Sequence, residues 1–191
     1  SLKACELGAD ALLVVTPYYN KVNADGLIKY YSEIADLSTK PIILYNVPSR
    51  TGVNIPLDVY IKLSKHENIA GVKEASGDIT KIAKIRACCP QDFAVWSGND
   101  DMTVPMMSLG AKGVISVLSN VLPMETQAMC RAALDGDFDT AADLQIKLLS
   151  LTEALFSEVN PIPVKAAMKI IGYDCGDCRL PLTAASATTV K

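Results

Sequence analysis

The chain contains one histidine, His66, and no apolar run long enough to cross a membrane. A membrane-spanning helix needs about 18 or more consecutive apolar residues, and every apolar segment here is much shorter. A single histidine with no neighbouring cysteine pair is a poor ligand set for zinc. The sequence therefore predicts no membrane association and no metal site. We interpret His66, in the polar segment SKHEN, as a solvated surface residue.

A basic surface stripe and a glycine-rich phosphate loop are also missing. The 191 residues carry 18 Lys and Arg against 21 Asp and Glu, a net charge of −3. Without a basic stripe, little is available to neutralise the phosphates of nucleic acid. Without the glycine-rich loop, nothing supports the binding of a nucleotide. We expect no nucleic-acid partner and no cofactor.

The six cysteines have no spacing that indicates a disulfide framework. Cys175 and Cys178 form a lone C-x-x-C motif, with neither a second ligand pair for zinc nor the strand–helix context of a redox site. The sequence has no N-x-S/T acceptor site and no N-terminal charged segment followed by an apolar core. These features favour reduced cysteines in loops and helices, and a cytoplasmic location.

Short apolar runs rich in Val and Ile recur through the first two thirds of the chain. Nearly continuous hydrophobic runs of this length are typical of parallel strands that are covered on both faces. The predicted strands span residues 11–16, 41–46, 69–75, 93–98 and 113–118.

Amphipathic helical patterns lie between these runs, and only helical patterns follow them. Pro56 in the first turn marks one helix start, and Gly136 and Gly172 mark two helix ends. The predicted helices span residues 24–38, 56–66, 79–89, 123–135, 138–158 and 161–172.

Regular alternation of strand and helix predicts repeated βα units, and hence an α/β fold. We expect a partial (β/α)8 TIM barrel of about five C-terminal βα units in residues 1–122, followed by a C-terminal helical domain in residues 123–191. Five strands are too few to close a barrel, and a complete barrel takes about 250 residues. We therefore expect further βα units to precede this chain in its parent protein.

Lys73 lies at the end of the apolar run IAGVKEASG, inside a predicted buried strand. Burial disfavours the charged form of lysine and lowers its pKa, which makes the amine a nucleophile for carbonyl compounds. Tyr45 ends the preceding strand and, at the same level, would handle protons for such chemistry. A structural lysine paired with Glu74 or with a backbone carbonyl is the alternative interpretation.

Other polar groups also follow the predicted strands. They include Tyr18 and Tyr19 after the first strand, Arg50 after the second and Gly98 after the fourth. Active sites of parallel α/β barrels are built at the carboxyl ends of their strands, so we expect these residues to meet Lys73. Asp100 and Asp101 in SGNDD could bind a metal, but we interpret an aspartate just before MTVPMM mainly as a helix N-cap.

The motifs YNVPSRTG and GVKEASG, with TPYYN upstream and SGNDD, GVISV and NPIPVK downstream, resemble the dihydrodipicolinate synthase (4-hydroxy-tetrahydrodipicolinate synthase) family. The resemblance runs from residue 1 to about residue 183. It implies condensation of pyruvate with L-aspartate 4-semialdehyde, in lysine and diaminopimelate synthesis, by a homotetramer built as a dimer of dimers. The arginine after YNVPS distinguishes this family from N-acetylneuraminate lyase.

The resemblance also implies a role for individual residues. Lys73 would form the Schiff base with pyruvate, Tyr45 would shuttle protons, and Arg50 would hold the carboxylate of the aldehyde. Tyr19 would enter the proton relay of a partner subunit. The resemblance places Ile115 and Gly98 in substrate binding and Tyr18 in an allosteric lysine site.

One element of the family pattern does not occur in this chain, namely the G-T-T-G-E segment with its proton-relay threonine. Two alternatives therefore stay open. The first is another class I pyruvate aldolase of the same superfamily, acting on a sugar acid or a 2-oxo acid. The second is an inactive fragment with only an oligomerisation role.

Overall fold

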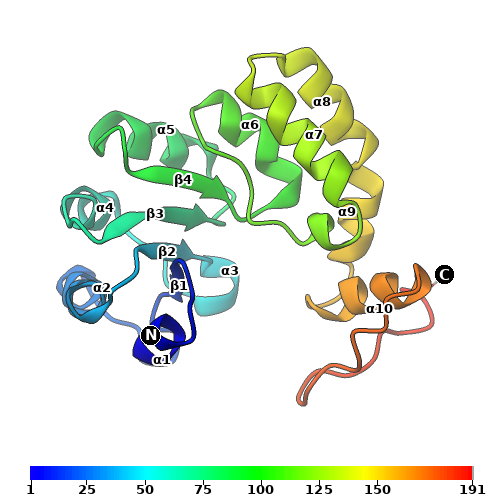
Figure 1. The fold of residues 1–191 in the computed structure, drawn as a ribbon, viewed down its shortest axis with the longest axis horizontal. Helices are drawn as coiled ribbons and strands as arrows, with labels where there is room; N and C mark the ends of the chain where they lie inside the picture. The colour runs from blue at the N-terminus through cyan, green and yellow to red at the C-terminus, as the bar shows by residue number, and fades with distance from the viewer. Residues whose placement is uncertain (191) are drawn as a thin grey trace. The chain divides into compact units, whose positions relative to one another are not determined.

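The structure, a computed structural model, describes residues 1–190. The chain divides into two compact units, Ser1–Ile115 and Ser116–Lys191, which we call unit 1 and unit 2. Unit 1 contains the parallel sheet and unit 2 is built of helices (Figure 1). The fold of unit 1 is therefore α/β, and every residue that the sequence places in the site belongs to unit 1.

Unit 1 is built on a four-stranded parallel sheet in the order β1-β2-β3-β4. The first four predicted strands are thus confirmed. The strands are β1 (Leu12–Val15), β2 (Ile42–Asn46), β3 (Ile69–Glu74) and β4 (Ala94–Ser97). Neighbours in sequence are neighbours in the sheet, and the arrowheads of β2, β3 and β4 point the same way (Figure 1).

Helices follow the strands and cover one side of the sheet. Helices α2 (Ala24–Leu37), α4 (Leu57–Leu63) and α5 (Ile79–Cys88) lie next to one another on that side (Figure 1). Their inward side chains are fully buried, as are the alternate strand residues Ile42, Leu44 and Val72. Side chains alternate across a strand, so the odd-numbered residues Tyr45 and Lys73 face away from these helices.

Short helices connect the remaining segments of unit 1. They are α1 (Leu2–Glu6), α3 (Pro48–Thr51), a 3-10 helix at Asp100–Met102 and α6 (Thr103–Ser108).

The fifth predicted strand, residues 113–118, is wrong as a strand. Its only sheet contact is an isolated parallel bridge between Val114 and Ser97 of β4. Ser119 N donates to Ser116 Oγ at 2.8 Å, and Val117 has helical backbone angles. Side-chain acceptors of this kind compete with the sheet ladder for backbone donors. The chain therefore leaves the sheet at Ser116 and enters a 3-10 helix at Leu118–Asn120.

Unit 2 consists of α7 (Pro123–Leu134), α8 (Phe138–Lys147), α9 (Leu149–Leu155) and α10 (Ile162–Ile170). The single helix predicted over 138–158 is wrong, because the helix is interrupted at Leu148, which caps both the end of α8 and the start of α9. Leu148 is buried with Leu118, Leu155 and Val164 in the core of this unit. Burial of one leucine at a bend, without Gly or Pro, explains why the sequence gives no sign of the break.

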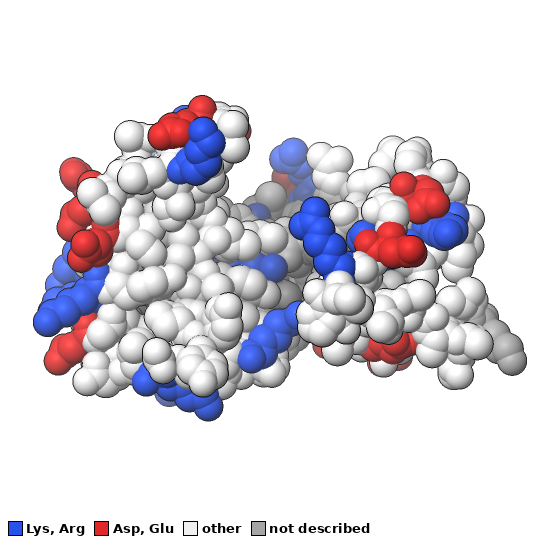
Figure 2. Space-filling view, turned by 90° about the horizontal axis from the view of Figure 1, so that it is seen from below, with Lys and Arg blue, Asp and Glu red and all other residues white. Residues whose placement is uncertain are grey.

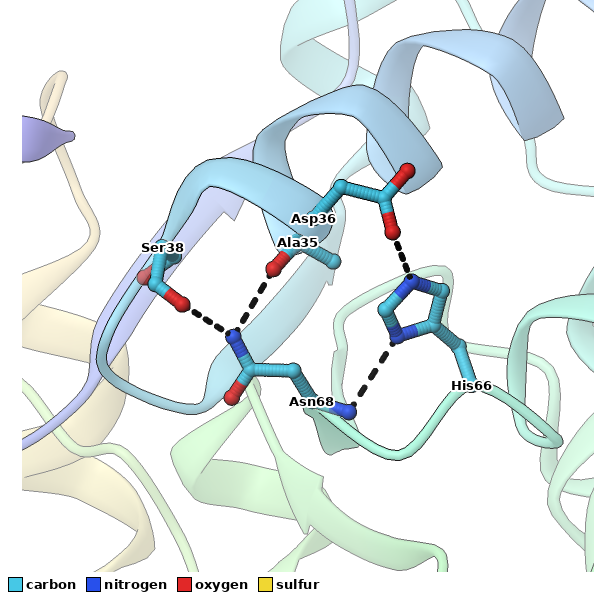
Figure 3. Close-up of polar contacts among 5 residues, drawn as sticks. All are labelled: Ala35, Asp36, Ser38, His66 and Asn68. Atoms are coloured by element: carbon cyan, nitrogen blue, oxygen red, sulfur yellow. Dashed lines mark hydrogen bonds and ion pairs between the residues drawn. The ribbon is translucent and has the colours of Figure 1, made fainter.

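His66 is not the solvated residue that the sequence predicts. Its side chain is 20% exposed, and its Nε2 lies 3.0 Å from Asp36 Oδ1 on α2 (Figure 3). Asn68 N donates to His66 Nδ1 at 3.2 Å. Since Nδ1 accepts this bond, the ring proton lies on Nε2, which donates a hydrogen bond to Asp36. His66 therefore fastens the segment before β3 to helix α2.

Asn68 completes this junction from the other side. Its Nδ2 donates to Ala35 O at 2.9 Å and to Ser38 O at 2.7 Å, at the end of α2 (Figure 3). The last carbonyls of a helix lack intrahelical partners, so the amide caps α2 from a distant segment.

The described residues include no membrane-spanning helix, and one face of the molecule is of mixed charge. No helix within residues 1–190 is long and apolar enough to cross a membrane. On the face drawn in Figure 2, basic side chains lie next to acidic ones, separated by wide areas of other residues. All six cysteines, which lie within the described range, are free.

We predict that Asn68→Ala lowers the free energy of unfolding by about 1–3 kcal/mol, because it leaves two helix-end carbonyls without their donor. Chemical denaturation of the full-length gene product measures this loss. Asn120→Ala is the control, since Asn120 is exposed and its amide bonds only to Val117 O three residues away. We expect that control to change stability by less than about 0.5 kcal/mol. Equal losses would contradict the capping role of Asn68.

Candidate active site

Lys73 stands near the end of β3, in the middle of the sheet. In the register, Tyr45 of β2 lies on one side of it and Trp96 of β4 on the other. Burial lowers the pKa of Lys73, the nearby Asp100 carboxylate raises it and the Arg50 guanidinium lowers it further. Desolvation is the largest of these effects, so the amine loses its proton more readily than an ordinary lysine does.

Tyr45 contacts Lys73 directly. The Lys73 Nζ lies 4.3 Å from the centroid of the Tyr45 ring. Burial raises the pKa of Tyr45, and the charge of Arg50 lowers it in part. The phenol therefore keeps its proton at neutral pH and can donate it to a group bound at Lys73.

The alternative of a structural lysine paired with Glu74 is not supported. Glu74 follows Lys73 on the opposite face of β3 and accepts hydrogen bonds from Asn46 and Tyr60. Among the described residues no ion pair joins Lys73 to Glu74. The amine of Lys73 is thus left for chemistry on the side of the sheet where Tyr45 lies.

Arg50 is placed by a short helix directly after β2. Pro48 provides a favourable first turn for α3, and Gly52, with φ of 64°, ends it in the left-handed region. Arg50 is exposed. Its charge lowers the pKa of both Lys73 and Tyr45. The guanidinium therefore acts on the space that these two side chains share.

Two glycines allow close packing near Lys73. A Cβ atom on Gly98 would lie 2.6 Å from Ala75 Cβ and 3.1 Å from Lys73 Cε. On Gly71, the register partner of Ile43 and two residues before Lys73, a Cβ atom would lie 2.1 Å from Ala94 O. Both positions are therefore restricted to glycine by close approach rather than by turn geometry. A side chain at position 98 would crowd Ala75 first and the Lys73 side chain next, so Gly98 lies beside Lys73 in the site.

Asp100 is a site residue that the sequence reasoning missed, and Trp96 is the register partner of Lys73 on β4. Asp100 opens the 3-10 helix that precedes α6. Asp100 is 2% exposed and its charge acts on Lys73. The signal for Asp100 was its place after a strand end. Trp96 could have been found from strand register alone.

Ile115 lies beside the end of β4. Its backbone N–H donates to Ser97 O at 2.9 Å, which holds residue 115 next to Gly98. The structure therefore places Ile115 at the same edge of the sheet as Lys73, although it does not continue as a strand.

Tyr18 and Tyr19 follow β1 and project from the surface. Tyr18 is 67% exposed and Tyr19 is 90% exposed. The structure thus brings Tyr45, Arg50 and Gly98 to Lys73 and leaves these two tyrosines outside the cluster.

A metal is not needed to explain this arrangement. No group of three or more His, Cys, Asp and Glu side chains within residues 1–190 is placed to hold a metal ion. A desolvated amine, a protonated phenol and a guanidinium at one sheet edge can instead bind and activate a carbonyl compound that carries a carboxylate.

Known proteins are similar to this chain in both sequence and fold. A family model described as the dihydrodipicolinate synthetase family matches residues 1–190. The 4-hydroxy-tetrahydrodipicolinate synthase of Caldicellulosiruptor saccharolyticus is 55% identical over 183 residues, which is 96% of this chain and 62% of that protein. The chain therefore spans less than two thirds of the length of this curated relative.

Two solved structures are also similar. The dihydrodipicolinate synthase of Thermotoga maritima superposes with a TM-score of 0.96 at 42% identity, over 99% of this chain and 65% of that one. The chloride-inhibited dihydrodipicolinate synthase of Acinetobacter baumannii, complexed with pyruvate, has a TM-score of 0.92 at 42% identity, over 97% and 64%. With its nearly complete match to the family model, the chain belongs to the dihydrodipicolinate synthetase family.

Proposed function

We propose that the protein is a 4-hydroxy-tetrahydrodipicolinate synthase that condenses pyruvate with L-aspartate 4-semialdehyde through an imine on Lys73. The observation that carries this proposal is the contact between the desolvated Lys73 amine and the Tyr45 ring, 4.3 Å from Nζ to the centroid. The relative from Acinetobacter baumannii, which is complexed with pyruvate, supports the choice of the first substrate.

In this reaction the neutral Lys73 amine attacks the carbonyl carbon of pyruvate. The oxygen leaves as water, and the proton that it needs comes from Tyr45. Tyr45, left as a phenolate, takes a methyl proton from the imine, which becomes an enamine, and the enamine carbon attacks the aldehyde of the second substrate, whose oxygen takes the proton back. The amino group of the second substrate then attacks the imine carbon, which closes the ring of the product and expels the Lys73 amine.

Arg50 is proposed to bind the carboxylate of L-aspartate 4-semialdehyde. A guanidinium suits this task because its planar fork forms two parallel hydrogen bonds with a carboxylate. Its exposure, together with its effect on the pKa of Lys73, supports a position at the entrance rather than at the imine. Gly98 and Ile115 would contact pyruvate through their backbone.

Further proposals concern the whole protein. We propose that unit 1 is part of a TIM barrel, followed by a C-terminal helical domain beginning near residue 123, and that the protein is a homotetramer in the cytoplasm. The exposure of Tyr19 supports its insertion into the relay of a partner copy, and that of Tyr18 supports a role in a lysine site.

The first prediction concerns Lys73. Borohydride treatment with pyruvate should add the mass of one reduced pyruvate to the full-length gene product, because reduction fixes the imine as a stable amine. Lys73→Ala should not be labelled, and neither should Lys73→Arg, because a guanidinium stays protonated. Labelling that survives in Lys73→Ala, measured by intact mass spectrometry, would falsify the assignment.

The second prediction concerns Arg50. Arg50→Ala should raise the KM for L-aspartate 4-semialdehyde by about 10-fold to 100-fold, since a charge-assisted hydrogen bond is worth about 1.5–3 kcal/mol. The KM for pyruvate should change by much less. Steady-state kinetics with each substrate varied in turn measure both values. Arg131→Ala, an exposed arginine of α7, is the matched control.

Equal effects of Arg50→Ala on both substrates would mean that Arg50 only holds its loop. A preference of the unmodified protein for N-acetylneuraminate or a sugar acid would instead favour another pyruvate aldolase. A folded protein without any pyruvate labelling would favour the inactive alternative.

The third prediction is a pH dependence with opposite signs in two variants. Imine formation needs the neutral amine, so its rate rises with pH through the pKa of Lys73. The Asp100 charge raises that pKa, so Asp100→Asn should move the rise to lower pH. The Arg50 charge lowers it, so Arg50→Ala should move the rise to higher pH. Rates of borohydride trapping across pH measure both shifts, and shifts of the same sign would refute this account.

A further inference from the structure

A buried polar cluster lies directly behind the Lys73–Tyr45 pair. Asn46 follows Tyr45 and Glu74 follows Lys73, and the two are register partners on β2 and β3. Consecutive residues of a strand point to opposite faces, so both side chains face the helices. Asn46 is 0% exposed and Glu74 is 2% exposed. Neither side chain reaches the face where a ligand of Lys73 would bind.

The amide of Asn46 joins three segments. Its Nδ2 donates to Glu74 Oε1 at 2.8 Å, to Glu74 Oε2 at 3.0 Å and to Asn54 Oδ1 at 2.9 Å. Its Oδ1 accepts a hydrogen bond from Ile55 N at 3.0 Å. The end of β2 is thereby tied to β3 and to the segment that leads into α4.

The carboxylate of Glu74 is surrounded by donors. Besides the bonds from Asn46, it accepts hydrogen bonds from the Tyr60 hydroxyl at 2.7 Å and from Ser76 N at 2.9 Å. Burial and the charge of Glu74 raise the pKa of Tyr60, so this phenol stays a donor. Every one of these bonds is accepted by Glu74, which is the pattern of an ionised carboxylate.

The positive counterpart is Lys81 on α5. Its Nζ donates to Ile55 O at 3.0 Å and to Asn54 Oδ1, the atom that also accepts from Asn46. Burial lowers the pKa of Lys81, while the charges of Glu74 and Asp78 raise it. The Glu74 charge is therefore balanced across one bridging amide rather than by a direct ion pair.

The main chain of the same two residues links three strand ends. Ala75 N donates to Asn46 O at 2.8 Å, and Gly98 N donates to Glu74 O at 2.8 Å. Residues 46 and 74 are thus held by side chain and backbone together. A buried charge costs free energy unless its partners are fixed, so the cluster makes this edge of the sheet stiff.

We propose that Asn46 and Glu74 are positioning residues, which hold the ends of β2 and β3 so that Tyr45 and Lys73 keep their contact. This inference rests on the proposed function of Lys73. It assigns to the buried face a role that is distinct from substrate contact. A displacement of about 1 Å in a reacting group can cost about 100-fold in rate, which sets the size of the expected effect.

The test uses Glu74→Gln in the full-length gene product. The amide introduced by Glu74→Gln would place an NH2 donor where the neighbouring groups are themselves donors. If the Asn46 amide turned so that its oxygen accepted from this NH2, it would lose the hydrogen bond from Ile55 N. We expect kcat and the rate of borohydride trapping at saturating pyruvate to fall together by about 10-fold to 100-fold. The KM for pyruvate should change by less than about threefold, because no substrate contact is removed.

Thr152→Val is the control for stability alone. Thr152 is 3% exposed in unit 2, and its hydroxyl donates to Leu148 O at 3.0 Å. Thermal melts of both variants give the stability loss, and all rates are measured below both transitions. We expect Thr152→Val to keep kcat within about twofold. If Glu74→Gln loses stability but its kcat, like that of Thr152→Val, stays within about twofold of the unmodified protein, the inference is overturned.

Tyr60→Phe is a second variant that leaves the carboxylate in place. It removes one donor from Glu74, so we expect a smaller loss of kcat, about 3-fold to 10-fold, with the KM for pyruvate again little changed. This variant decides the question if Glu74→Gln fails to fold. Full activity of a folded Tyr60→Phe protein would then count against the positioning role.

A last measurement separates this inference from the proposed function. Competitive acetylation of Lys73 with acetic anhydride, followed by peptide mass spectrometry across pH, reports the state of the amine without pyruvate. In Glu74→Gln, or in Tyr60→Phe if that variant is used, the pH midpoint of Lys73 acetylation should move to higher pH, because the amine becomes less buried. In Thr152→Val it should not move. If the unmodified protein traps no pyruvate, the proposed function fails. If the acetylation profile of Lys73 in Glu74→Gln, or in Tyr60→Phe, equals that of the unmodified protein, the positioning role is overturned.

Discussion

The in-register pairing of β2 with β3 is the constraint on which the site depends. One register places Tyr45 beside Lys73 on the open face and Asn46 beside Glu74 on the helix face. A slip of one residue would exchange the two faces, burying the amine under the helices and exposing the carboxylate. The reactive pair and the buried polar pair are therefore fixed by the same set of backbone hydrogen bonds.

The same register explains why small residues surround the lysine. Gly71 lets β3 approach β4 at Ala94, and Gly98 lets Ala75 and the Lys73 side chain pack closely beside it. A larger residue at either position would have to displace backbone or the lysine itself. Tyr45 lies against the amine, with its ring centroid 4.3 Å from Nζ, and Trp96 is the register partner of Lys73 on β4. The lowered pKa of Lys73 follows from this packing rather than from one specific partner.

The sequence predicted those parts of the fold that depend on local pattern. Strands β1 to β4 are nearly continuous apolar runs and helix α2 has an amphipathic pattern, while Lys73, Tyr45, Arg50 and Gly98 lie at or just after strand ends. The wrong predictions depend on long-range contacts. The bend at Leu148 arises from packing in the core of unit 2, and His66 is held by Asp36, 30 residues away. The effect of Asp100 on Lys73 was not predicted, because an aspartate just before a helix is usually interpreted as a cap.

The charges around Lys73 show why a site of this kind needs both signs. Desolvation and Arg50 push the pKa of the amine down, and Asp100 pushes it back up. A nucleophilic amine that also takes part in proton transfer works best when its pKa lies near the working pH. Arg50 is exposed and can change its distance to Lys73 when a carboxylate binds, whereas Asp100 is buried and its contribution is constant. A carboxylate bound at Arg50 would neutralise the guanidinium charge and make the amine more basic, which would favour the protonated form of an imine on Lys73.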